Sequence, residues 1–114
     1  MAGVKRSIEM LILGLLAESP NHAYGLRKSI DLLLGRFHKM SDGMLYPLLK
    51  ELSERGCISG SAERGDRAPD KVIYRLNEAG EKRLRELMAV PLECSYYDDK
   101  LDFYARYALF GLLS

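Results

Sequence analysis

The chain has 114 residues, which is enough for one domain with at most a small appendage. With 47% hydrophobic and 29% charged residues it has an ordinary globular composition, and its net charge of +1 indicates neither a nucleic acid nor a membrane as partner. The two cysteines lie far apart with no histidine at ligand spacing, which argues against structural zinc and favours thiols in a reducing cytosol.

The first expected element is a helix over residues 4–18. Its apolar residues surround most of its circumference, which is typical of a helix covered from both sides. Its broad apolar face consists of Ile8, Leu11, Ile12, Leu15 and Leu16. The basic start and apolar run also resemble a signal peptide, but Glu9 interrupts the run and no small residue precedes a cleavage position.

Two further helices are expected next. Asn21 is expected to cap the second helix, which ends at Gly35, and Ser41 to cap the third, which ends at Gly56. Both helices carry an apolar stripe at helical spacing. The stripe of the second helix is Leu26, Ile30, Leu33 and Leu34. The stripe of the third helix is Leu45, Leu48, Leu49 and Leu52.

The rest of the chain contains strand-like and helical patterns. Two short runs, residues 57–62 and 71–76, flank a polar loop and predict a β-hairpin. Asn77 is expected to cap a fourth helix, "EAGEKRLRELMA", and a largely apolar helix is expected from residue 96 onward. This order predicts a mainly α fold with a small β-hairpin, namely a winged helix-turn-helix domain over residues 1–90. Residues 91–114 are expected to form a C-terminal dimerisation helix or the start of a longer C-terminal domain.

The stretch "SDGMLYPLLKELSERG" (residues 41–56) has an unusual outward face. Gly43 and Pro47 lie nearly opposite the leucine stripe, with Lys50 close by and Tyr46 on the flank. Glycine costs about 1 kcal/mol in a helix interior and proline about 3 kcal/mol. A functional contact through this face explains why such residues stand there.

Three pieces of the sequence then resemble the PadR family of bacterial transcriptional regulators. These are "LILGLLAESPNHAYGL" (11–26), "SDGMLYPLLKELSERGCI" (41–58) and "YRLNEAGEKRL" (74–84). The resemblance covers about residues 8–88, with Met44 standing where the family usually has Thr or Ser. It implies a bacterial, cytoplasmic regulator, expected to be a repressor, that binds double-stranded DNA at a palindromic operator as a homodimer.

DNA contacts are expected from the third helix and the wing, because the recognition helix of this arrangement enters the major groove with its N-terminal part. The third helix supplies Ser41, Gly43, Met44, Tyr46, Pro47 and Lys50, and the wing supplies Arg64, Arg67 and Lys71. Alternatives remain open. Pro47 can mark a late helix start, Tyr46 can pack over the core edge, and Lys50 can be ordinary solvated surface. The wing can likewise be a solvated turn with local ion pairs.

The last segment is almost wholly apolar, so its helix is expected to pair with a second copy. The expected dimerisation residues are Leu11, Leu15, Leu101, Tyr104, Tyr107, Ala108 and Leu112. The PadR resemblance likewise implies two-fold dimers formed by C-terminal helices packed on the first helix. A pocket for a small aromatic or hydrophobic effector is also considered, with a plain packed interface as the alternative. Its lining would be Phe103, Tyr104, Tyr107 and Phe110.

No sequence pattern indicates an enzyme, a cofactor or a metal site. The cluster Asp98, Asp99 and Asp102 falls in the first turns of the last helix, where carboxylates complement the helix dipole. A phosphate-binding loop and a nucleophile elbow are both absent from the sequence. The alternative to a DNA-binding regulator is therefore a winged helix module that binds only protein.

Overall fold

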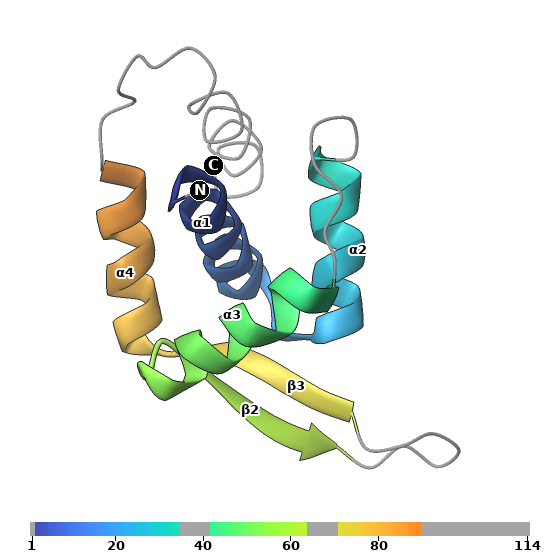
Figure 1. Ribbon diagram of the computed structural model, residues 1–114. Helices are drawn as coiled ribbons and strands as arrows, with labels where there is room; N and C mark the ends of the chain where they lie inside the picture. The colour runs from blue at the N-terminus through green and yellow to red at the C-terminus, as the bar shows by residue number, and fades with distance from the viewer. Residues whose placement is uncertain (1, 35–41, 64–70, 90–114) are drawn as a thin grey trace.

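The computed structural model describes residues 2–34, 42–63 and 71–89. Within these ranges the elements are α1 (Ala2–Glu18), β1 (Asn21–His22), α2 (Ala23–Leu34), α3 (Asp42–Glu54), β2 (Ile58–Glu63), β3 (Lys71–Leu76) and α4 (Glu78–Ala89). Helix α1 stands between α2 and α4, with α3 and the β2–β3 hairpin below it (Figure 1). The predicted mainly α fold with a small hairpin is confirmed.

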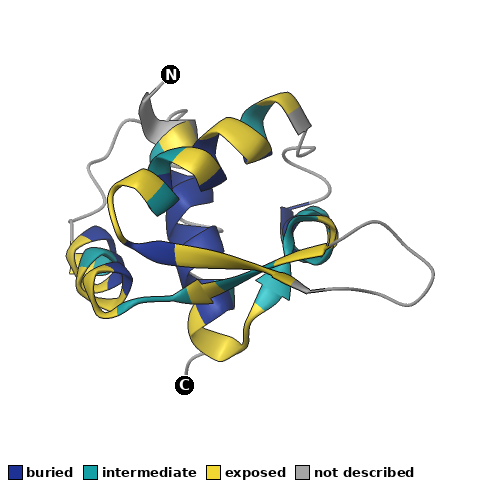
Figure 2. Ribbon diagram, turned by 90° about the horizontal axis from the view of Figure 1, so that it is seen from below, coloured by how far each residue is buried: buried dark blue, intermediate teal, exposed yellow. Residues whose placement is uncertain are grey.

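Helix α1 forms the centre of the hydrophobic core. Ile8, Leu11, Ile12 and Leu13 have no exposed surface, and the helix contacts α2, α4 and β3. In Figure 2 the buried residues concentrate on this central helix, whereas the strands are largely exposed. Burying one such side chain contributes about 1.5–3 kcal/mol, so α1 organises the domain. The expectation of a helix covered from both sides is confirmed.

A buried carboxylate, Glu9, lies on this central helix and is only 4% exposed. Its Oε1 accepts a hydrogen bond of 2.9 Å from Nε of Arg83 on α4, and Nη1 of Arg55, just after α3, lies 3.7 Å from the same oxygen. The hydrogen bond to Glu9 is the main cause of the raised pKa of Arg83. The residue that interrupts the apolar run in the sequence therefore ties three helices together.

Helix α3 buries the predicted leucine stripe and ends where glycine allows it. Leu45, Leu48, Leu49 and Leu52 are all at most 3% exposed. After the helix Gly56 adopts a φ of 76°, a conformation that costs glycine little. Its N–H donates to the Ser53 carbonyl at 3.1 Å, and the next N–H donates to the Leu52 carbonyl at 3.0 Å. This pair of bonds is a Schellman motif, and it confirms the predicted stop.

The sheet has three antiparallel strands in the order β1–β3–β2. The hairpin register runs from Ile58 opposite Leu76 to Glu63 opposite Lys71, so the predicted hairpin is confirmed. Strand β1 was not predicted. Its two residues are too few to show an alternating pattern, and they are strand only because Asn21 and His22 pair with β3.

Asn77 takes the position expected for the cap of α4, though not through its side chain, whereas the expected Asn21 cap of α2 is wrong. Asn77 precedes α4, and its carbonyl accepts the first helical bond from Glu81. Its side chain bonds the Gly56 carbonyl and the Ser59 hydroxyl instead of its own helix. The expected Asn21 cap of α2 is wrong, because Asn21 belongs to β1 and α2 begins at Ala23. His22 occupies the capping position.

Several predicted sites lie outside the described residues. These are Ser41, Arg64 and Arg67 of the expected DNA contacts, the five expected dimer residues from Leu101 to Leu112, and the four aromatic residues of the expected effector pocket. Leu11 is fully buried within one chain and Leu15 is half-buried, so their contact with a second copy stays a prediction. Of the helices described, none has the length and apolar character needed to cross a membrane.

Candidate nucleic-acid interface

The face of α3 opposite the leucine stripe is open to solvent. Gly43, Pro47 and Lys50 are exposed, and Tyr46 is 53% exposed. Met44 differs, because it is half-buried and packs against the core. The side chains predicted from the helical period to face outward therefore do so, with Met44 at the boundary.

Pro47 lies inside α3 and not at its start, so the alternative of a late helix start is wrong. Proline has no N–H and therefore cannot donate the usual helical bond to the carbonyl of Gly43, four residues earlier. Both residues are exposed, so water or another external donor can reach the backbone at this point. The helix is continuous through this face even though its local chemistry is unfavourable.

The start of α2 is organised by His22. The N–H of Gly25 donates to Nδ1 of His22 at 2.8 Å, and the N–H of His22 donates to Oδ1 of Asn21 at 2.9 Å. His22 is therefore the N-cap residue, with its ring nitrogen in the place of the usual side-chain oxygen. Pairing of β1 with β3 fixes the position of the cap relative to the wing.

A tyrosine and a lysine extend the same surface along α2. Tyr24 is 60% exposed, and Nζ of Lys28 lies 5.2 Å from the centre of its ring. An ammonium at this distance is attracted to the ring face. The pair is spaced four residues apart, so it lies on one side of the helix.

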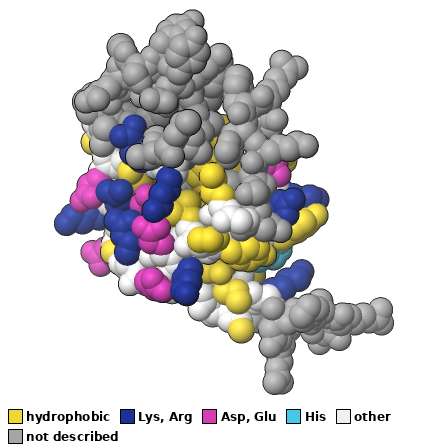
Figure 3. Space-filling view, viewed as in Figure 1, with side chains coloured by type: hydrophobic (Ala, Val, Ile, Leu, Met, Phe, Trp, Pro, Cys, Tyr) yellow, Lys and Arg dark blue, Asp and Glu magenta, His cyan; other side chains and the backbone are white. Residues whose placement is uncertain are grey.

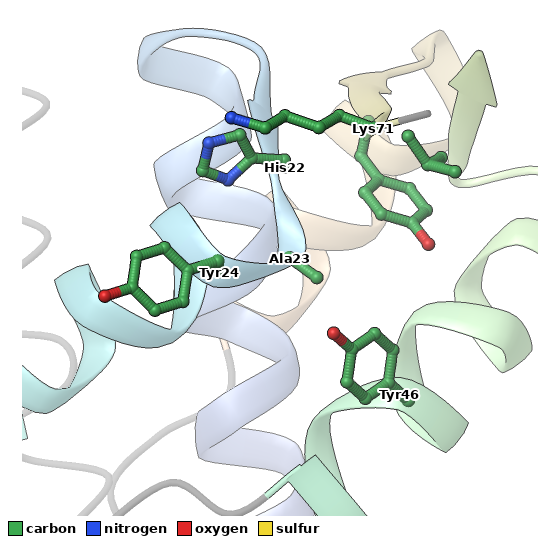
Figure 4. Close-up of a pocket in the computed structure, with 7 residues that line it drawn as sticks. His22, Ala23, Tyr24, Tyr46 and Lys71 are labelled. Atoms are coloured by element: carbon green, nitrogen blue, oxygen red, sulfur yellow. The ribbon is translucent and has the colours of Figure 1, made fainter. Parts of the chain in front are cut away.

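An open hollow of about 390 Å³ joins these elements. It is lined by His22, Ala23, Tyr24, Tyr46, Lys71, Val72 and Tyr74. Figure 4 shows that Tyr46 points its hydroxyl toward the start of α2, whereas Tyr24 points its hydroxyl away from Tyr46. In Figure 3 hydrophobic side chains gather between α3 and α2, while Lys, Arg, Asp and Glu intermingle on the side of α4.

Tyr74 of the hollow remains a protonated donor at neutral pH. Burial raises the pKa of Tyr74, and the neighbouring Tyr46 raises it further. A phenol whose pKa lies above its ordinary value of 10.0 keeps its proton and can donate a hydrogen bond. Val72 is 40% exposed beside them, so the hollow combines apolar walls with polar hydrogen-bond donors.

The structure thus brings together Tyr46 and Lys71 of the predicted DNA contacts, and it places Lys50 on the same face of α3. Tyr24, Lys28 and Tyr74 were not among the predicted site residues. The spacing of Tyr24 and Lys28 was an available signal, but it is common on ordinary helix surfaces. Among the described residues no group of three His, Cys, Asp or Glu side chains is arranged to hold a metal ion.

The described elements define a winged helix-turn-helix domain. Three helices are followed by an antiparallel hairpin, a short strand precedes the second helix, and the third helix has an open outward face. The sequence comparison agrees with this class. The model of the transcriptional regulator PadR-like family matches residues 12–86, and the chain belongs to this family. It is therefore a transcriptional regulator and not an enzyme.

Solved structures of similar proteins share the fold. A PadR family transcriptional regulator from Eggerthella lenta is 29% identical with a TM-score of 0.64, covering 75% of this chain and 73% of that one. A PadR-like transcription factor from Bacteroides fragilis is 28% identical with a TM-score of 0.66, covering 75% and 80%. Bacillus subtilis PadR in complex with operator DNA is 23% identical with a TM-score of 0.68, covering 90% and 58%. No curated protein matches the chain.

Proposed function

We propose that this protein is a cytoplasmic, sequence-specific DNA-binding repressor that binds a palindromic operator as a homodimer through α3 and the wing. The observation that carries the proposal is the outward face of α3. Gly43, Tyr46, Pro47 and Lys50 are all exposed there, and Tyr46 adjoins the base of the wing through Lys71 in the shared hollow.

The chemistry of this face suits the major groove of DNA. Gly43 has no side chain, so the backbone can approach the duplex closely. Lys50 can reach a phosphate oxygen or the O6 and N7 acceptors of guanine, and the Tyr46 hydroxyl can donate to a phosphate. A helix that only faced water would gain nothing from an interior proline that costs about 3 kcal/mol. The crystallised complex of Bacillus subtilis PadR with operator DNA supports this proposal by its fold.

The dimer follows from the geometry of palindromic DNA. Two half-sites are read together only when two recognition helices are held about one helical turn, or roughly 34 Å, apart. Two residues of the predicted contact surface are described, the half-buried Leu15 and the fully buried Leu11 of α1. Sedimentation equilibrium of the full chain should give a dimer at micromolar concentration. A monomer at that concentration would contradict the homodimer.

The DNA-binding proposal is tested by selecting operators from random duplexes and then measuring affinity. Lys50→Ala should weaken binding, and the slope of log affinity against log salt should become shallower by about 0.9 if the lost contact is to one phosphate. Lys82→Ala, an exposed lysine on α4, is the matched control and should change neither quantity.

Removing only the hydroxyl group of Tyr46 gives a milder test of the same proposal. Tyr46→Phe should also weaken binding, while circular dichroism stays unchanged. If both Lys50→Ala and Tyr46→Phe bind the selected duplex as the native chain does, α3 is not the reading element. If the native chain selects no duplex at all, the alternative of a winged helix module that binds only protein is favoured.

A further inference from the structure

We propose that the hollow between α2, α3 and β3 seats one sugar–phosphate unit of the bound DNA, with the Nε2–H of His22 donating to a phosphate oxygen. The inference rests on the proposed DNA-binding function and adds a second contact region to it. His22 then has two roles, because one ring nitrogen caps α2 and the other binds the DNA backbone.

The hydrogen bond that caps α2 determines which ring nitrogen of His22 carries the proton. Nδ1 accepts the Gly25 N–H at 2.8 Å, so this nitrogen carries no proton. In a neutral imidazole the proton must then reside on Nε2, which becomes an obligatory donor. The cap therefore fixes both the tautomer and the orientation of the ring. His22 is half-buried and lines the hollow, so its donor is held in place and little side-chain freedom is lost on binding.

The charge around the hollow is positive. Lys71 lines it together with His22, and Lys28 stands against the ring of Tyr24. No carboxylate is among the side chains that line it in the described part of the chain. The N-terminus of α2, a helix of 12 residues, adds the positive end of its dipole. The hollow is therefore suited to an anion.

The hollow also has apolar walls. Ala23, Val72 and the tyrosine rings form walls that a phosphate alone would leave unused. A deoxyribose ring offers an apolar face next to its phosphate, so a sugar–phosphate unit matches both parts of the hollow. The hollow also lies beside Tyr46 on α3, so a strand that follows the edge of the groove would meet the two surfaces in succession.

The openness of the hollow favours a strand over a small free ligand. Small-molecule sites usually bury about 70–90% of the ligand surface. Here Tyr24 and Tyr46 stay 60% and 53% exposed, so a small ligand would remain largely in water. A polymer strand does not need enclosure, because its neighbouring nucleotides bind other parts of the same face.

Two substitutions separate the capping role from the binding role. His22→Asn keeps an acceptor for the Gly25 N–H but removes the Nε2 donor, and asparagine is a good N-cap residue. His22→Asp caps the helix equally well and adds a favourable charge at the dipole, yet places a carboxylate against the phosphate. A merely structural histidine would leave both variants with native DNA affinity.

The experiment measures the affinity of the native chain and both variants for the selected operator and for copies with one phosphate replaced by a neutral methylphosphonate. His22→Asn should bind the intact operator about tenfold more weakly, as expected for the loss of one charge-assisted hydrogen bond. His22→Asp should lose about a hundredfold or more while its melting temperature stays native or rises.

The proposal is decided by whether the contribution of His22 to affinity depends on one particular phosphate. Neutralising one particular phosphate should weaken the native chain and leave His22→Asn unaffected, whereas the other phosphates should affect both proteins alike. Native affinity in both variants, or the same loss at every phosphate, would overturn the proposal while leaving DNA binding intact. Failure of the native chain to bind any selected duplex would overturn the proposed function as well.

Discussion

The buried carboxylate of Glu9 allows a quantitative prediction for stability. Replacing Arg83 by methionine keeps an apolar stem of similar length but removes the 2.9 Å hydrogen bond and leaves the carboxylate in the core. Breaking a fully buried pair from one side costs about 3–5 kcal/mol. The loss should be smaller here, because the Arg83 side chain is 31% exposed and Arg55 remains 3.7 Å from the carboxylate.

We therefore expect Arg83→Met to lower the free energy of unfolding by about 2 kcal/mol. With an unfolding entropy of about 2.1 cal/mol/K per residue, this loss lowers the melting temperature of a domain of this size by about 8 °C. Calorimetry and urea unfolding at one fixed protein concentration measure both quantities, since association would otherwise shift them. Arg85→Met, at an exposed position on the same helix, is the matched control and should stay within about 0.5 kcal/mol of the native chain.

The double variant Glu9→Met with Arg83→Met tests the physical reason. It removes the stranded charge, so it should recover at least half of the stability that the single variant loses. A melting temperature for Arg83→Met within the range of the Arg85→Met control would refute the reasoning. So would a double variant that is less stable than Arg83→Met alone, since the cost would then not come from the unpaired carboxylate.

Three further results are expected. Gly80→Ala should destabilise the protein by about 1–3 kcal/mol, because a methyl group there would overlap the backbone carbonyl of Cys57, and a native melting curve would contradict this contact. The hydrogen bond from Lys5 lowers the pKa of Glu51 below 4.5. The stabilisation from the Lys5–Glu51 pair should therefore be fully present above the ordinary pKa of the carboxyl group and be lost as the pH falls through the lowered pKa of Glu51. Glu51→Gln should accordingly reduce the fall of the unfolding free energy at acid pH. His22→Ala should lower the unfolding free energy by about 1 kcal/mol through loss of the cap, and His22→Asn should restore it; equal melting temperatures for all three chains would exclude the capping role.

The sequence predicted those parts of the fold that depend on neighbouring residues. The leucine stripe of α3 follows from the helical period alone, and Gly56 stops the helix because glycine tolerates a φ of 76°. The hairpin follows from two short runs flanking a polar loop. The exposed side chains of α3 were predicted by the same rule, because once the leucines face inward the opposite residues must face outward.

The tertiary structure decided whatever depends on residues far apart in the chain. Glu9 looks like an interruption in the sequence, and its partner Arg83 lies 74 residues further on. Asn21 satisfies every local rule for a cap, yet pairing with Tyr74 of β3 places it in a strand and gives the cap to His22. The spacing of apolar residues along the sequence indicates which face of a helix or strand is apolar. Strand pairing and helix packing determine which of these faces meet. For that reason the sequence alone could determine which residues of α3 face outward, and only the tertiary structure could assemble the hollow beside them.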